Sequence, residues 1–285
     1  MVLGVTYLFY YTELHREVTE LHRENTSVVC LWIIVKNIIK SSTIKQRMNI
    51  ALIGYGKMGK EIETIALERG HRISLTVDVN NRHELTRENL QKCDVAIEFT
   101  TPETAVDNVK ACFVAGVPVV CGSTGWLAKI DEVKRDCKSK NAGFFYASNY
   151  SVGVNVFFRL NQYLAKLMST VEGYSVGVEE IHHTAKKDAP SGTAITIAEG
   201  IMKEISQLKR WVNQAQGGTD ELPIVSVRQD PVPGTHVVTY KSDVDTITIS
   251  HEAKSRRGFA LGAVLAAEFM RGKKGCYGME DLMKN

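Results

Sequence analysis

Short apolar runs alternate with helical patterns through the first half of the chain. The first run, Asn49 to Ile53, predicts a strand, and the spacing of apolar positions after it predicts a helix up to Arg69. A second helix is expected over 101–115, with Thr101 as its N-cap and Pro102 at its first position. Further strands are predicted over 73–77, 94–100, 117–121 and 143–147. Repeated strand–helix units predict an α/β fold with a doubly wound parallel sheet, which binds its ligand at the carboxyl ends of the strands.

The pattern changes after Ser151. A helix is predicted over 155–168, where Phe157 and Leu160 lie on one apolar stripe. Strands then follow one another with little helix between them, which predicts a second, more antiparallel α+β domain. These strands are expected over 174–181, 224–227, 236–240 and 245–251. A final apolar helix over 259–269 could return the chain to the first domain.

Composition narrows the class of protein. The chain has 285 residues, of which 44% are hydrophobic and 24% charged, as is typical of a globular protein with a sizeable core. A net charge of +3 is too small to indicate a nucleic-acid or membrane partner. The six cysteines are scattered and form no C-x-x-C pair, so neither a zinc site nor a disulfide framework is expected. Buried thiols in a reducing compartment, and hence a cytoplasmic location, fit this pattern best.

A glycine motif follows the first predicted strand. In Gly54-Tyr55-Gly56-Lys57-Met58-Gly59 the first glycine permits a tight turn, the second lets the backbone approach a pyrophosphate, and the third lets helix and strand pack closely. Asp78 ends the second strand, nineteen residues after Gly59, where a carboxylate can accept hydrogen bonds from a ribose diol. The motif indicates a Rossmann-type dinucleotide site. The alternative is a plain strand–helix–strand unit whose glycines serve packing alone.

The ends of the later strands extend this site. Since parallel strands present their carboxyl ends at one edge of a sheet, two further segments are expected beside the glycine motif. These cofactor-binding candidates are Gly122, Ser123 and Thr124, and Ala147, Ser148, Asn149 and Tyr150. Asp78 disfavours a cofactor with a 2′-phosphate by charge repulsion, while Arg82 could offset that repulsion. We therefore expect NADH to be preferred and NADPH to be tolerated.

These patterns divide the chain into three parts. Residues 48–150 are expected to form the dinucleotide-binding domain, which 257–285 complete, and 151–256 to form a second, substrate-binding domain. The first 47 residues are expected to be an extraneous or disordered extension, with Met48 as the native start. They hold two heptads, too few for a coiled coil, and an apolar run over 28–39 that is too short to cross a membrane.

Proton chemistry is indicated by the run from His182 to Ala194, which reads HHTAKKDAPSGTA. Imidazole titrates near neutrality, and an ammonium such as that of Lys186 can hold an anion or donate a proton. The Pro190-to-Thr193 stretch turns the chain and then offers free backbone N–H groups, which suit a carboxylate. The run therefore favours a small acidic substrate and needs no metal. An exposed polar loop before a helix is the alternative interpretation.

Five motifs in one order resemble a known family. They are the glycine motif, Glu98-Phe99-Thr100-x-Pro102, Gly122-Ser123-Thr124-Gly125, Ser148-Asn149-Tyr150-Ser151-x-Gly153-Val154-Asn155 and the histidine run. Together they resemble the 4-hydroxy-tetrahydrodipicolinate reductases, long called dihydrodipicolinate reductases, of the diaminopimelate and lysine pathway. The resemblance extends from Met48 to about Lys284.

The resemblance implies a reaction and its residues. Family members reduce a cyclic, dicarboxylated substrate with NADH or NADPH, release water, and assemble as homotetramers, so the second domain would also serve oligomerisation. By resemblance, His182 is the proton donor or acceptor and Lys186 a second proton donor. The implied substrate contacts are His183, Ser191, Gly192 and Thr193. Arg256 or Arg257 is another candidate for an anion contact, but a solvated charge at the start of the helix is the preferred interpretation. Lys187 is expected to face solvent.

Two rival functions are compatible with parts of the pattern. One is another Rossmann-type dehydrogenase that acts on an aspartate-derived substrate, but it would not need the whole histidine run. The other is a non-catalytic NAD(H)-binding sensor. A sensor would keep the glycine motif and Asp78 but would need neither His182 nor Lys186.

Overall fold

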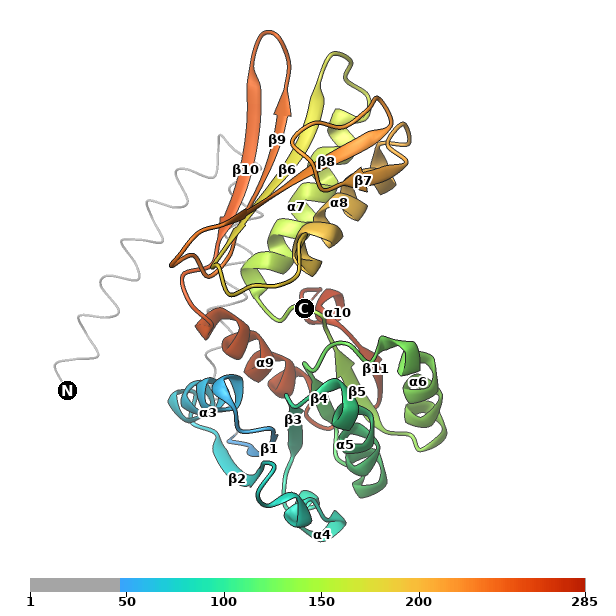
Figure 1. Cartoon of the computed structure of the whole chain (residues 1–285). Helices are drawn as coiled ribbons and strands as arrows, with labels where there is room; N and C mark the ends of the chain where they lie inside the picture. The colour runs from blue at the N-terminus through green and yellow to red at the C-terminus, as the bar shows by residue number, and fades with distance from the viewer. Residues whose placement is uncertain (1–46, 285) are drawn as a thin grey trace, which may run out of the picture. The chain divides into compact units, whose positions relative to one another are not determined.

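The computed structural model describes residues 47–284, which form two β-sheets with their covering helices (Figure 1). The heptads and the apolar run over 28–39 lie outside the described residues. The first sheet has six parallel strands in the order β11-β5-β4-β3-β1-β2, which confirms the predicted doubly wound sheet. Its strands are β1 (Asn49–Ile53), β2 (Arg72–Val77), β3 (Val95–Glu98), β4 (Val119–Cys121), β5 (Gly143–Tyr146) and β11 (Gly275–Tyr277).

Helices cover both faces of the first sheet. One face packs against α3 (Lys57–Glu68) and α9 (Arg257–Met270), and the other against α5 (Pro102–Ala115) and α6 (Ile130–Ser139). Successive residues of β1 alternate between the two cores, as the pleat of a strand requires. The short elements of this part are η1 (Arg82–Glu84), α4 (Arg87–Leu90), η2 (Leu127–Lys129) and α10 (Met279–Leu282).

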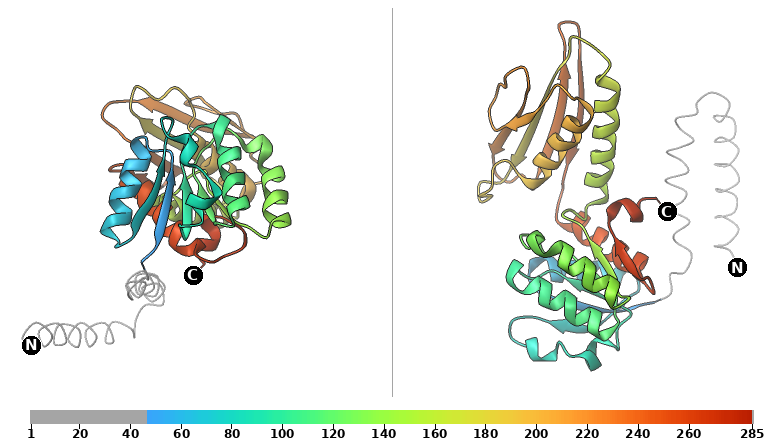
Figure 2. Two further views of the ribbon diagram at one scale, coloured as in Figure 1. Left: turned by 90° about the horizontal axis from the view of Figure 1, so that it is seen from below. Right: turned by 90° about the vertical axis from the view of Figure 1, so that its right-hand side faces the viewer.

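The second sheet is mixed. Its order is β10-β9-β6-β8-β7, with β6 antiparallel to β9 but parallel to β8. Figure 2 shows α7 (Val152–Met168) and α8 (Gly192–Glu204) side by side on one face of this sheet. The strands are β6 (Ser175–His182), β7 (Arg210–Val212), β8 (Glu221–Arg228), β9 (Thr235–Lys241) and β10 (Thr246–Glu252). The predicted antiparallel character therefore holds for two of the four strand pairs.

The differences from the sequence prediction include two short strands and the start of one helix. Strands β7 and β11 have three residues each, with mostly exposed or half-buried side chains, so no apolar run marks them. Helix α7 begins three residues before the predicted start, because Ser151 Oγ accepts a hydrogen bond from the Val154 N–H at 3.3 Å and caps it. Thr101 does precede α5, but its hydroxyl makes no capping bond to the helix.

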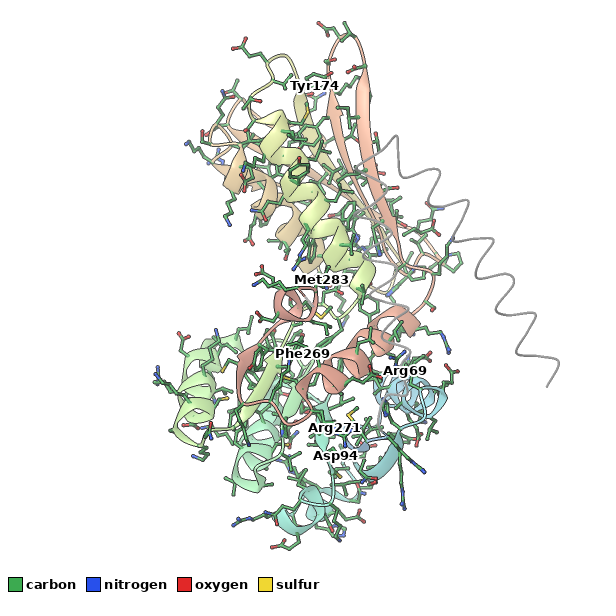
Figure 3. The ribbon with its side chains drawn as sticks, turned by 180° about the vertical axis from the view of Figure 1, so that it is seen from behind. Arg69, Asp94, Tyr174, Phe269, Arg271 and Met283 are labelled. Atoms are coloured by element: carbon green, nitrogen blue, oxygen red, sulfur yellow. The ribbon has the colours of Figure 1, made fainter. Side chains whose placement is uncertain are left out.

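An ion-pair cluster ties α9 to the start of the first sheet. Arg69 donates from Nε and Nη2 to the two carboxylate oxygens of Glu268, at 2.7 and 2.9 Å. His71 Nε2 lies 2.9 Å from Oε1 of the same carboxylate. Figure 3 shows Arg69 beside α9. The last long helix is thus held against the first one by packing and by charge. Within 47–284, no helix combines the length and the apolar character that crossing a bilayer requires.

Candidate active site

The glycine motif forms the turn between β1 and α3. Gly54 has φ +97°, and a Cβ built on it would lie 2.1 Å from the Phe99 carbonyl oxygen. A Cβ on Gly59 would lie 2.3 Å from the Gly54 carbonyl oxygen. By contrast, nothing lies within 4 Å of a Cβ on Gly56. Gly54 and Gly59 are therefore required by packing inside the protein. Gly56 faces open space, as is needed where a backbone approaches a ligand.

The surroundings of this turn suit an anion and a ribose. Helix α3 begins at Lys57, has no acidic residue in its first turn, and presents unpaired N–H groups next to Gly56. Asp78, half-buried at the end of β2, receives no hydrogen bond on its carboxylate from any residue in 47–284. Of the remaining motif residues, Met58 is half-buried and Tyr55 donates its hydroxyl to the Glu63 carboxylate.

Strand register brings the predicted cofactor segments to one edge. Ile53 pairs with Val77 and with Glu98, and Glu98 pairs in turn with Cys121. Cys121 pairs with Tyr146, so the residues after all five strands lie along a single edge. Along that edge, Gly122 is half-buried, Thr124 and Ser148 are exposed, Ser123 and Ala147 are buried, and Asn149 is half-buried.

A buried carboxylate organises two of these loops. Glu98 is fully buried, and its Oε1 accepts hydrogen bonds from the Thr100 N–H at 3.0 Å and from Ser123 Oγ at 3.1 Å. Its Oε2 accepts from Cys121 Sγ at 3.0 Å. Ser123 Oγ also accepts from the Thr100 N–H at 2.8 Å. The Ser123 side chain is thus engaged within the protein, and its carbonyl accepts a hydrogen bond from Trp126 Nε1 at 2.7 Å.

Tyr150 and Asn149 have different surroundings. Tyr150 is buried, and its ring is tilted against that of Phe99 with 5.6 Å between ring centres. Its hydroxyl donates to the Cys121 carbonyl at 2.8 Å. Burial raises the pKa of this phenol well above its ordinary value. Asn149 Nδ2 donates to Thr193 Oγ1 at 3.4 Å. This bond joins the edge of the first sheet to the predicted substrate-binding residues at the start of α8.

The histidine run leaves the carboxyl end of β6. His182 is the last residue of the strand and is buried, whereas His183 is half-buried and its carbonyl accepts the Lys186 N–H at 3.1 Å. Lys186 Nζ donates to both carboxylate oxygens of Asp188, each at 2.8 Å, and this contact lowers the pKa of Asp188. Lys187 is exposed. An exposed ion pair contributes little to stability, so Lys186 can leave Asp188 for a bound anion at small cost.

The start of α8 provides the expected backbone donors. Ser191 Oγ accepts the Ala194 N–H at 3.2 Å and caps the helix. Gly192 is exposed, with nothing within 4 Å of a Cβ built on it, and Thr193 is half-buried. The helix carries no acidic residue in its first turn. Its N-terminus therefore favours a carboxylate by dipole and by free N–H groups.

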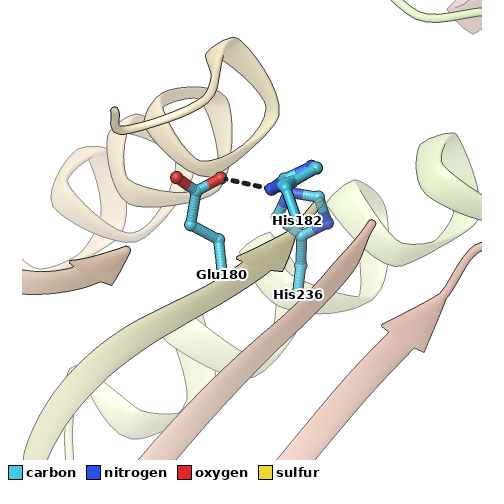
Figure 4. A group of neighbouring side chains, drawn as sticks. All are labelled: Glu180, His182 and His236. Atoms are coloured by element: carbon cyan, nitrogen blue, oxygen red, sulfur yellow. Dashed lines mark ion pairs between the residues drawn. The ribbon is translucent and has the colours of Figure 1, made fainter. Parts of the chain in front are cut away.

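Three polar side chains around His182 were not among the sequence candidates: the buried Glu180 and His236 and the half-buried Arg228. Glu180 is fully buried, and its Oε2 lies 3.0 Å from His182 Nδ1 (Figure 4). Its Oε1 accepts the Ser191 N–H at 3.0 Å and Arg228 Nη2 at 3.1 Å. The His236 ring lies 5.2 Å from that of His182, nearly perpendicular to it, and its Nε2 lies 3.3 Å from Ser191 Oγ.

The environment fixes the charges of this cluster. Burial alone would raise the pKa of Glu180, but contacts from His182 and Ser191 outweigh it and hold that pKa well below its ordinary range. Burial lowers the pKa of His236 to about 4, and the neighbouring His182 adds to the effect. Near neutral pH the cluster therefore contains an ionised Glu180, a guanidinium and an uncharged His236.

The spacing of polar residues in the strands could have revealed this cluster. Glu180 stands two residues before His182, so both side chains project from the same face of β6. That face is otherwise apolar and packed under helices, so a glutamate in it is a signal of a buried polar function. The partners depend on sheet register, which pairs Glu180 with His236 and His182 with Arg228.

The same three side chains have metal-ligand chemistry. Ligand atoms of Glu180, His182 and His236 all lie within 4.8 Å of one another. The carboxylate, however, already holds the Arg228 guanidinium at 3.1 Å. A second cation on that carboxylate would face direct repulsion from the first. The donors around Glu180 fit a hydrogen-bonded acid–base cluster better than an ion site.

Arg257, the first residue of α9, has a structural explanation. Arg257 pairs with the Glu68 carboxylate and lies 4.0 Å from that of Glu61, both on α3. This contact accounts for Arg257 without a substrate.

Comparison with known proteins identifies the family. Models described as "Dihydrodipicolinate reductase, N-terminus" and "Dihydrodipicolinate reductase, C-terminus" match residues 48–150 and 153–283. A 4-hydroxy-tetrahydrodipicolinate reductase from Christiangramia forsetii is 50% identical over 240 residues, which cover 84% of this chain and 98% of the relative. One from Caldanaerobacter subterraneus is 35% identical, with 80% and 95% covered. The dipicolinate-bound dihydrodipicolinate reductase from Paenisporosarcina sp. TG-14 shares the fold, with a TM-score of 0.66 at 22% identity over 83% of this chain and 99% of that one. The chain belongs to the dihydrodipicolinate reductase family.

Proposed function

We propose that this chain reduces 4-hydroxy-tetrahydrodipicolinate to tetrahydrodipicolinate with NADH or NADPH, and that His182 and Lys186 manage the proton. As a family member, it is an NAD(P)H-dependent oxidoreductase of lysine and diaminopimelate biosynthesis, not a sensor or a dehydrogenase of another aspartate-derived substrate. The observation that carries the residue assignment is the bond from Asn149 to Thr193, at 3.4 Å. It links the strand-end edge beside the glycine turn to the helix start that suits a carboxylate.

The candidate residues fall into three groups, which bind the cofactor, bind the substrate and transfer the proton. The cofactor supplies the hydride, and the open Gly56, the N-terminus of α3 and Asp78 fit its pyrophosphate and ribose. The N-terminus of α8 with Gly192 and Thr193 binds one substrate carboxylate, and His183 contacts the substrate beside it. Lys186 exchanges its partner Asp188 for the substrate, and His182 or Lys186 delivers the proton that accompanies the hydride while the hydroxyl leaves as water.

A coupled assay tests this function directly. Aspartate semialdehyde and pyruvate are converted by the preceding synthase, and the protein is added with NADH while absorbance of the reduced nicotinamide is followed. Oxidation of NADH is expected only when the synthase is present. Oxidation without the synthase product, or none with it, would contradict the proposal.

Thr193→Val tests the substrate site. The change replaces a hydroxyl at the start of α8 with a methyl group of similar size. It should therefore raise the Michaelis constant for the dicarboxylate more than it lowers turnover. The measurement is a full substrate titration at saturating NADH. Thr196→Val, whose hydroxyl is bonded to the Gly192 carbonyl at 3.0 Å inside the same helix, is the matched control and should leave the constant unchanged. Equal losses in both variants would remove Thr193 from the binding site.

Asp78→Ala tests the cofactor preference. If the Asp78 carboxylate binds the ribose diol, its loss should weaken NADH more than NADPH, because the carboxylate repels a 2′-phosphate. Separate Michaelis constants for the two cofactors give the answer. Equal changes in both would exclude the role for Asp78.

We also propose that residues 48–150 with 257–284 form the cofactor domain and 151–256 the substrate domain, with residues 1–47 dispensable. Support comes from β1, which begins at Asn49, and from the family match, which begins at residue 48. Deletion of residues 1–47 should therefore leave thermal unfolding and turnover unchanged. An insoluble or inactive product would show that the segment belongs to the working enzyme.

Assembly as a homotetramer in the cytoplasm is the remaining part of the proposal. On the face of the second sheet away from α7 and α8, the half-buried side chains include Val225, Val227 and Val237, which suits contact with another copy of the chain. Buried free thiols such as those of Cys112 and Cys121 suit a reducing compartment. Sedimentation velocity would measure the assembly state.

A further inference from the structure

Glu180 is a buried carboxylate that the reaction scheme above does not use. We infer that Glu180 is a positioning residue, which holds His182 in the tautomer with its proton on Nδ1 and so makes Nε2 the atom that exchanges a proton with the substrate. The inference rests on the proposed function, in which His182 is the acid–base group. It adds a residue whose carboxylate acts through His182 without touching the substrate.

The contacts of the ring support this assignment. His182 Nδ1 and Glu180 Oε2 form an ion pair at 3.0 Å, although their alignment is not that of a hydrogen bond. A carboxylate oxygen repels a nitrogen lone pair at this distance, so Nδ1 is the nitrogen that carries the proton. The other nitrogen, Nε2, receives no hydrogen bond from any residue within 47–284. A Cβ built on Gly234 would lie 3.0 Å from Nε2, so the glycine keeps this nitrogen uncovered. An imidazole with one nitrogen bound to a carboxylate and the other free is arranged for proton transfer at the free nitrogen.

Glu180 also fixes where the ring stands relative to the substrate site. Its second oxygen accepts the Ser191 N–H at 3.0 Å, immediately before the start of α8. One carboxylate therefore spans from the proton-transferring imidazole to the loop that places Gly192 and Thr193. Because the carboxylate is fully buried and its Oε1 accepts hydrogen bonds from both the Ser191 N–H and Arg228, it has little freedom to move.

The remaining charged groups near the ring come from four other segments. Arg228 on β8 neutralises Glu180, and its Nη2 also donates to the Asp188 carbonyl at 2.6 Å. His236 on β9 has a lowered pKa and stays uncharged near neutrality. The other groups that face the cluster are Lys186 and Asp188 in the loop and His251 on β10. Glu180 is thus the carboxylate within reach of His182 Nδ1 among the described residues.

Glu180→Gln is the central variant, and Glu179→Gln is its control. The control residue is the neighbour in β6, exposed on the opposite face of the strand. The loss of a carboxylate that orients a catalytic histidine can lower turnover by up to about 10⁴-fold, so Glu180→Gln should lower turnover by at least about tenfold. The Michaelis constant for NADH should stay constant. The pH profile of turnover should differ from that of the wild type, because the altered contact lies at the ring that exchanges the proton. Glu179→Gln should match the wild type in all three measurements.

A double-mutant cycle separates positioning from a structural role. If Glu180 acts through His182, then adding Glu180→Gln to His182→Gln should lower turnover no further, whereas independent effects would multiply. Multiplying effects with an unshifted pH profile would overturn the inference. Glu180→Asp, which keeps the charge, should recover part of the lost turnover. A loss of activity on metal chelation, restored by Zn²⁺, would also overturn it and would make the carboxylate a ligand.

The tautomer itself can be read in the unaltered enzyme. Two-bond ¹H–¹⁵N spectra of ¹⁵N-histidine protein distinguish Nδ1–H from Nε2–H, and the His182 signals are those missing from His182→Gln. We expect a neutral ring protonated on Nδ1. A ring protonated on Nε2 would reject the inference even if Glu180→Gln failed to fold. Because this spectrum needs no substrate, it decides the role of Glu180 even if the coupled assay contradicts the proposed reductase reaction.

Discussion

Turnover should fall by at least about 10²-fold when His182 is replaced by glutamine, since general acid–base catalysis typically contributes ~10²- to 10⁴-fold. Glutamine can occupy the site and form hydrogen bonds but cannot exchange a proton near neutral pH. Its effect should appear in turnover, because His182 stands at the end of β6 and not in the glycine turn that suits the cofactor. NADH affinity, measured by fluorescence titration, should stay the same.

The pH dependence makes this prediction specific. The wild-type profile should contain a limb that is absent in His182→Gln. His236 cannot supply that limb near neutrality, because burial lowers its pKa to about 4. Near-wild-type turnover of His182→Gln across the pH range would contradict the acid–base role of His182 and would leave the histidine run with substrate binding only.

Lys186→Ala should produce a loss of similar size, with Lys187→Ala as the control. The two lysines are neighbours, but only Lys186 is half-buried and paired, to Asp188, while Lys187 is exposed. A general loss of positive charge would affect both variants alike. A selective loss in Lys186→Ala would place its ammonium at the substrate.

Gly54→Ala should damage both folding and cofactor binding. The backbone has φ +97° at Gly54, and the added methyl would stand 2.1 Å from the Phe99 carbonyl oxygen, so the turn must move. Backbone strain of this kind costs roughly 1–3 kcal/mol, and the overlap adds to it. For a chain of this size, about 2 kcal/mol lowers the midpoint of thermal unfolding by roughly 4–8 °C. NADH affinity should also fall by at least about tenfold, a free-energy loss of ~1.4 kcal/mol, because the displaced turn carries the open Gly56.

Two other glycines separate the causes. Gly70 has φ +83° but nothing within 4 Å of a Cβ, so Gly70→Ala should lower stability through strain alone and leave NADH binding intact. Gly56→Ala meets no protein atom within 4 Å, so it should fold normally and bind NADH weakly. Differential scanning fluorimetry and NADH titration on the three variants give the comparison. A Gly56→Ala variant with unchanged NADH affinity would remove the turn from the cofactor site.

Periodicity predicted those parts of the fold in which local pattern and tertiary burial agree. The run Asn49–Ile53 is a short apolar segment, and as a strand it is buried on both faces of the sheet. Strand β11 was missed for the opposite reason. Its three residues, Gly275–Tyr277, are mostly exposed, and it becomes a strand only because the edge of β5 offers hydrogen-bonding partners.

The site was predictable where its residues are consecutive and unpredictable where sheet register assembles it. The run from His182 to Thr193 carries its own chemistry, and the structure leaves its proposed roles open to test. Arg228 and His236 lie 46 and 54 residues after His182, and only the pairing of β6 with β8 and β9 brings them to Glu180. Alternation along one strand predicts which face a residue occupies, but it does not predict which residue stands opposite on the neighbouring strand.

The return of the chain to its first sheet has a consequence for how the protein folds while the ribosome makes it. One of the two cores of that sheet joins Leu52 and Ile62 to Ala263 and Val264 of α9, and β5 stays an edge strand until β11 arrives. About 110 residues separate β5 from α9, so a ribosome that adds roughly 5–20 residues per second leaves this apolar face uncovered for about 5–20 seconds. During that interval the nascent chain presents a hydrophobic surface and an unpaired strand edge, which are the features that chaperones bind. Nascent chains stalled before α9 should therefore depend more on chaperones than chains released after β11.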